Sequence, residues 1–189
     1  AESGVKNLTI PDTVTSIGNS AFYNCDRLID LTLPNSVVTI EKDAFFECSN
    51  LENITIPSSV DSVGNYAFDN CIKLNNVYYT ATIGGWCSID FEKYGSPMMC
   101  AQNLYINGVL IEGDFVIPNY VFYIGDWTFS YCDNITSVDI SDNVITLGVG
   151  AFSGCNNLTS VKISDNVEQL SDYLFSNCSN LTNVEISDN

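Results

Sequence analysis

A 23-residue repeat constrains the fold of this chain more than any other feature. Residues 28–50 read LIDLTLPNSVVTIEKDAFFECSN and residues 51–73 read LENITIPSSVDSVGNYAFDNCIK, without a gap. Full copies cover 5–27, 28–50, 51–73, 112–134, 135–157 and 158–180, and a partial copy covers 181–189. Repeats of this size are typical of solenoids, in which each unit buries its apolar face against its neighbours. We therefore expect residues 1–189 to form a single solenoid.

Each repeat, numbered from its first apolar residue (Leu28, Leu51), contains two short extended segments. Positions 1, 4 and 6 are apolar and position 7 is often proline, as in LENITIP of residues 51–57. The alternation predicts a strand, which proline ends because it has no N–H to donate. Apolar positions 10 and 13, such as Val60 and Val63, predict the second segment.

The second half of each repeat predicts a corner and a buried phenylalanine. Glycine at position 14 suggests unusual backbone dihedrals there. These glycines are Gly18, Gly64, Gly125 and Gly148. The Ala-Phe pair at positions 17 and 18 should turn inward, and its phenylalanines should form one buried column. They are Phe22, Phe45, Phe68, Phe129, Phe152 and Phe175.

The motif LxxIxIPxxVxxIGxxAFxxC, as in residues 51–71, resembles the BspA-like leucine-rich repeats of bacterial and protist surface proteins. The resemblance covers nearly the whole chain. It implies a right-handed, mainly β leucine-rich-repeat solenoid with little helix. It also implies an extracellular or cell-surface location and a role in adhesion or protein binding.

Residues 74–111 interrupt the repeat. Residues 74–79 still match its start, and Asn107-Gly108 lies between apolar segments at 104–106 and 109–111. Asn-Gly in this setting predicts a β-hairpin with a type I′ turn. We expect a degenerate repeat with an insert that ends in this hairpin. The aromatic residues of the insert form either a satellite core on the solenoid or a partner-binding bulge.

The composition argues against several functions. The chain has 23 acidic and 6 basic residues, a net charge of −17 and no histidine. Nucleic-acid binding needs a basic surface, and histidine is the commonest general base and metal ligand. No phosphate-binding glycine loop, nucleophile elbow or CxxC motif occurs, and no apolar run is long enough to span a membrane. We expect no enzyme activity, no catalytic residues, no cofactor, no metal, no nucleic-acid partner and no membrane span.

Six cysteines share repeat position 21. They are Cys25, Cys48, Cys71, Cys132, Cys155 and Cys178. Stacked side chains point the same way, so their Cβ atoms stay farther apart than a disulfide needs. We expect free, buried thiols in two runs of three. Cys87 and Cys100 lie in the insert, and the sequence leaves open whether they form a disulfide.

These observations favour a non-catalytic, monomeric module, secreted or at a bacterial cell surface, that binds an extracellular protein or glycan. The alternatives are a structural spacer in a larger surface protein, and a glycan-binding module that uses the aromatic residues of the insert. Phe122 and Tyr123 are aromatic where other repeats are not, which suggests a contact surface. The candidate binding surface is Phe122, Tyr123, Tyr120, Trp127, Tyr131, Trp86 and Tyr94.

Overall fold

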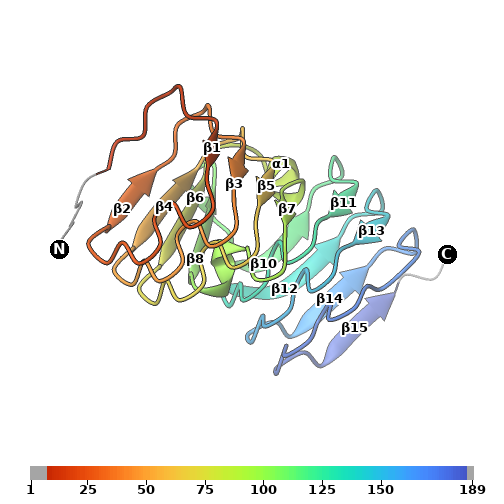
Figure 1. Ribbon diagram of the computed structural model, residues 1–189. Helices are drawn as coiled ribbons and strands as arrows, with labels where there is room; N and C mark the ends of the chain where they lie inside the picture. The colour runs from red at the N-terminus through yellow and green to blue at the C-terminus, as the bar shows by residue number, and fades with distance from the viewer. Residues whose placement is uncertain (1–7, 187–189) are drawn as a thin grey trace.

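The computed structural model describes residues 8–186 as a mainly β solenoid of about seven turns (Figure 1). The predicted fold class is therefore confirmed. The first strand of each turn is β2 (Asp30–Thr32), β4 (Asn53–Ile56), β6 (Asn76–Tyr79), β8 (Asn103–Ile106), β10 (Gly113–Ile117), β12 (Ile135–Ile140), β14 (Ser160–Ile163) or β15 (Asn183–Ile186). The second is β1 (Ser16–Ile17), β3 (Thr39–Ile40), β5 (Ser62–Val63), β7 (Asp90–Phe91), β11 (Tyr123–Ile124) or β13 (Thr146–Leu147). Within residues 8–186, no helix is long and apolar enough to cross a membrane.

One repeat makes one turn of the solenoid. In β4 and β6, Ile54 lies beside Val77 in a parallel register, one repeat further along the chain. Ile54 and Ile56 are fully buried, whereas Asn53 and Thr55 face outward. The alternating pattern read from the sequence thus places repeat positions 4 and 6 inside the coil.

The corner of each turn differs from the prediction. The backbone φ is positive at repeat positions 16 and 20, and not at the glycines of position 14. Those at position 16 are Ser20, Asp43, Tyr66, Tyr94, Trp127, Gly150 and Tyr173. Glycine at position 14 serves close approach instead: a Cβ on Gly64 would lie 2.6 Å from the backbone N of Lys42 in the preceding turn.

The positive φ values accompany a third row of hydrogen bonds between turns. The N–H groups of positions 16, 18 and 20 donate to carbonyls of the next turn. In the second repeat, the N–H of Asp43 donates to the Asn65 carbonyl (3.0 Å) and that of Phe45 to the Ala67 carbonyl (2.8 Å). The same bonds join the first repeat to the second, and the repeats at 112–134, 135–157 and 158–180 to one another.

The phenylalanines form two stacks rather than the single column expected. Phe45 stacks between Phe22 and Phe68, with ring centroids 5.3 and 5.2 Å away. Phe152 stacks between Phe129 and Phe175, at 5.3 and 5.9 Å. The turn between the stacks has no Ala-Phe pair. It buries Trp86, Phe91 and Met98 instead, and all three belong to the main core rather than to a satellite core.

The insert has a different layout from the one predicted. Asn103 of β8 lies beside Asn76 of β6, 27 residues earlier, so the irregular turn carries four extra residues. It contains the short helix α1 (Ile83–Cys87), which is capped by the Thr82 side chain, and the 3-10 turn η1 (Pro97–Met99). The hairpin is confirmed: β8 pairs with β9 (Val109–Leu110), and Asn107 and Gly108 have φ of 49° and 79°. Its first strand, however, continues the stack instead of projecting from it.

The hairpin ends the first sheet. The order β2-β4-β6-β8-β9 closes with antiparallel β9, and a new sheet begins as β10-β12-β14-β15. The second strands break at the same place, between β7 and β11. Contacts near α1 join the two halves: Trp86 Nε1 donates to the Thr128 carbonyl (3.0 Å), and the Gly125 N–H donates to the Cys87 carbonyl (3.0 Å).

The phenylalanine stack gives a direct test of the register. Phe45→Ala should lower the free energy of unfolding by about 3–5 kcal/mol, because Phe45 is fully buried between two rings. Phe122→Ala removes the same atoms from a side chain that is 60% exposed and should cost less than about 0.5 kcal/mol. Urea denaturation of both variants measures the difference, and equal losses would contradict this register.

Candidate binding surfaces

The candidate residues from the sequence separate into three environments. Tyr120, Phe122 and Tyr123 are 53%, 60% and 46% exposed. Ile145 extends this group: its N–H donates to the Phe122 carbonyl (3.0 Å), and its side chain is also exposed. We call Tyr120, Phe122, Tyr123 and Ile145 the aromatic patch. It lies along β11 and β13, beside α1 (Figure 1).

Trp86 does not belong to any surface, and the sequence prediction for it is wrong. Trp86 belongs to α1, and its side chain is completely buried between the rings of Tyr79 and Phe91. The indole N–H is satisfied by the Thr128 carbonyl, as buried Trp N–H groups usually are. Trp86 therefore joins the two halves of the solenoid and cannot contact a partner.

Tyr94, Trp127 and Tyr131 lie on another side of the coil, where they line a cleft of about 290 Å³. Tyr173, Lys93 and Asn177 complete most of its wall, and the sequence prediction missed these three residues. We call this the corner cleft, because its aromatic residues occupy the corner positions 16 and 20. The corner cleft spans the break between the two sheets, with Tyr94 before the break and the other rings after it.

Two glycines make room for the rings of the corner cleft. Gly150 and Gly154 occupy positions 16 and 20 of the repeat between Trp127 and Tyr173. A Cβ on Gly154 would lie 2.7 Å from Cδ1 of the Tyr131 ring, and one on Gly150 would meet the Trp127 ring. The two rings therefore rest on the backbone of the next turn, in space that other repeats fill with side chains.

The aromatic residues of the corner cleft have a strained backbone. Tyr94, Trp127, Tyr131 and Tyr173 have φ between 54° and 59°. Bulky side chains rarely adopt this left-handed conformation, whereas glycine, asparagine and aspartate tolerate it. Packing explains the aromatic residue at one of these left-handed positions, since the Tyr94 ring lies between those of Tyr66 and Trp127, with ring centroids 5.4 and 6.1 Å away. Tyr173, however, is 65% exposed.

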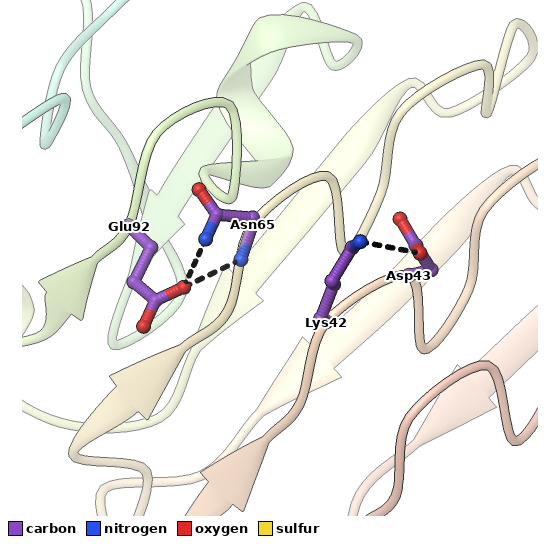
Figure 2. A network of polar contacts seen from close by, with 4 residues as sticks. All are labelled: Lys42, Asp43, Asn65 and Glu92. Carbon is purple, nitrogen blue, oxygen red and sulfur yellow. Dashed lines mark hydrogen bonds and ion pairs between the residues drawn. The ribbon is translucent and has the colours of Figure 1, made fainter.

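The acidic side chains near the corners join neighbouring turns. Glu92 accepts hydrogen bonds from the backbone N–H (3.0 Å) and the side-chain amide (2.5 Å) of Asn65 (Figure 2). Asp126 accepts from the Val149 N–H at 2.7 Å. Lys42 lies 3.7 Å from Asp43 in the same region. Within residues 8–186, no group of three or more acidic or cysteine side chains is placed to hold a metal ion.

The cysteines are free thiols in the described part of the chain, Cys87 and Cys100 included. The Cys71 thiol donates to the carbonyl of Phe45, in the preceding turn (3.2 Å), and Cys100 donates in the same way to Phe68 (3.3 Å). Cys100 thus extends the first run to four cysteines, where the sequence predicted three. Burial raises the pKa of Cys87 and Cys132, so both thiols are unreactive in the folded protein.

Comparison with protein families agrees with this architecture. The family model described as "BspA type Leucine rich repeat region" matches residues 1–93 and 107–189, with six copies. A leucine-rich-repeat protein from T. pallidum is 25% identical with a TM-score of 0.43, and the match covers 91% of this chain and 63% of that one. A leucine-rich cell surface protein from Faecalibacterium prausnitzii is 21% identical with a TM-score of 0.33, covering 95% and 78%. The chain thus spans less than two thirds of the T. pallidum structure, and no curated protein gives a significant match.

Buried thiols should make stability depend on pH. Above the ordinary thiol pKa of 9.0, Cys132 ionises in the unfolded chain but stays protonated in the folded protein, which therefore binds more protons. The free energy of unfolding should fall with rising pH, by up to about 1.4 kcal/mol per pH unit for each such thiol. Cys132→Ala should reduce this slope more than Cys25→Ala, because Cys25 is only half-buried. Equal slopes in urea denaturation above pH 9.0 would refute this assignment.

Strain at Tyr173 predicts a stabilising substitution. A left-handed backbone costs a residue with a side chain about 1–2 kcal/mol, which a glycine substitution would relieve. Glycine also gives the unfolded chain more conformational entropy, which offsets about 0.5–1 kcal/mol of this relief. Because Tyr173 is exposed, Tyr173→Gly should raise the free energy of unfolding by about 0.5–1 kcal/mol. Asn24→Gly is the matched control at another positive φ, where asparagine is already tolerated, and should change stability less. A lower free energy of unfolding for Tyr173→Gly would show that the backbone at Tyr173 is not strained.

Proposed function

The chain belongs to the BspA-type leucine-rich-repeat family, and we propose that it is a non-catalytic protein-interaction module, secreted or at a cell surface. The aromatic patch carries this proposal. In this patch, the side chains of Phe122 and Tyr123 are exposed to solvent. They lie on a stack of turns that are hydrogen-bonded to each other. Exposed aromatic groups of this kind are typical of the central, energetically dominant part of protein interfaces.

The rigidity of the solenoid favours binding at this surface. Tyr123 and Ile124 pair with Thr146 and Leu147 of the next turn, so the patch is fixed before a partner arrives. A preorganised surface loses little conformational entropy on binding. Solenoids also offer a long lateral face rather than a deep pocket, which suits a macromolecular partner.

The charge of the chain indicates which partners would associate fastest. With a net charge of −17, the protein attracts basic surfaces and repels acidic ones. We propose an extracellular protein with a basic rim around an apolar contact, bound by the monomer. A structural spacer, by contrast, would not need exposed aromatic residues and would show no salt-dependent binding to a partner.

Binding to immobilised fibronectin, laminin and type IV collagen tests the proposal. We expect at least one of these probes to bind, with an association rate that falls as salt rises. The double variant Phe122→Ala/Tyr123→Ala should weaken that binding about tenfold or more, equivalent to about 1.4 kcal/mol. Ile72→Ala, at a side chain that is 75% exposed outside the patch, is the control and should bind as the unmodified protein does.

Two results would contradict the proposal. One is the absence of binding to every probe, and the other is unchanged affinity of the double variant. Size-exclusion chromatography with light scattering accompanies both measurements, because a dimer that buries the patch would also contradict it.

A further inference from the structure

We propose that the corner cleft is a saccharide-binding site. This site is separate from the aromatic patch, and its ligand is independent of any protein partner there. The inference starts from Tyr173, an aromatic residue with a left-handed backbone that is 65% exposed and stacks on no other ring of the described chain. Strained residues that lack a packing role are concentrated at functional sites.

The dimensions of the corner cleft suit a small ligand. Its volume of about 290 Å³ is just below the usual range for ligand pockets, about 300–1,000 Å³. The rings of Trp127 and Tyr131, which rest on the backbone of Gly150 and Gly154, form part of its wall. One or two sugar rings match this space better than a folded protein surface or an extended peptide.

The lining has the two chemical features that a sugar ring needs. A pyranose presents a face of C–H groups with slight positive charge, which is attracted to the negative π face of an aromatic ring. It also presents hydroxyls at its edge. Within residues 8–186, the hydroxyls of Tyr94, Tyr131 and Tyr173 have no hydrogen-bond partner, and neither has the side-chain amide of Asn177. These groups are free to bond the sugar hydroxyls.

The positive charge of Lys93 indicates which charge the sugar is expected to carry. Lys93 is the one charged residue among the described residues that line it, in a chain with 23 acidic side chains. Its Nζ lies 5.1 Å from the centroid of the Tyr94 ring, where it already makes a cation–π contact. A cationic ligand would therefore be repelled, and a neutral or carboxylate-bearing sugar is favoured.

The same residues favour binding over hydrolysis. Glycoside hydrolysis ordinarily uses two carboxyl groups on either side of the scissile bond. The lining residues supply aromatic, hydroxyl, amide and ammonium groups and no carboxyl pair. The proposed site thus holds a saccharide without cleaving it.

Tryptophan fluorescence provides a direct assay. The chain has two tryptophans, and Trp86 is completely buried, so a ligand in the corner cleft should change the emission of Trp127 alone. The probes are galactose, N-acetylglucosamine, glucuronic acid, N-acetylneuraminic acid and a glycan array that contains their oligosaccharides. We expect array binding and a saturable emission change for the matching sugar.

Two variants test the geometry. Tyr173→Ala should weaken the affinity roughly tenfold without impairing folding, and Tyr23→Ala, an exposed tyrosine in another turn, should have no effect. Gly154→Asn keeps a residue that tolerates positive φ, but its Cβ would displace the Tyr131 ring from the wall of the cleft, so it should abolish binding. Circular dichroism checks the fold of this variant. Lys93→Gln should weaken binding only if the sugar is acidic.

The outcomes are decisive. Binding that depends on Tyr173 but not on Tyr23 supports the site, and the Lys93→Gln result separates acidic from neutral sugars. The absence of binding to every array glycan overturns the proposal, as does unchanged affinity of Tyr173→Ala. Neither result bears on the aromatic patch, whose variants are tested against protein probes.

Discussion

The hydrogen bonds between consecutive corners are the interaction on which this solenoid depends. At repeat positions 16, 18 and 20 the backbone N–H groups point along the stack, as in the bonds from Asp43 to Asn65 and from Phe45 to Ala67. This direction requires a left-handed residue on each side of the phenylalanine. The phenylalanine stack and the ladder of thiols donating to phenylalanine carbonyls then follow from the same geometry.

The irregular turn shows what replaces this interaction when it is missing. Within the described residues, the corner bonds do not join the turn at 74–100 to its neighbours. Ring contacts of Tyr94 with Tyr66 and Trp127, together with the buried indole of Trp86, bridge the gap. Aromatic residues are therefore needed at this junction, which explains their local excess and leaves Tyr173 as the ring without such a role.

The sequence predicted what the 23-residue period determines. Inward positions such as Ile54 and Ile56, and the Asn107-Gly108 turn, depend on local patterns, and the structure confirms them. It also confirms burial of four of the six phenylalanines, which are Phe45, Phe68, Phe129 and Phe152. The sequence did not predict the internal layout of the insert, because four extra residues and the helix α1 change the register between β6 and β8. For this reason Trp86 was wrongly assigned to the surface. The corner cleft did leave a signal: Tyr173 stands at position 16, beside Gly150 in the preceding repeat.

The corner cleft, unlike strands β11 and β13 of the aromatic patch, is built across the break in the sheets. Lys93 and Tyr94 precede the break, whereas Trp127, Tyr131 and Tyr173 follow it, so the cleft is built from both halves of the solenoid. β11 and β13 of the aromatic patch lie entirely in the second half. A ligand in the cleft would contact residues of both halves and should therefore stabilise the junction between them.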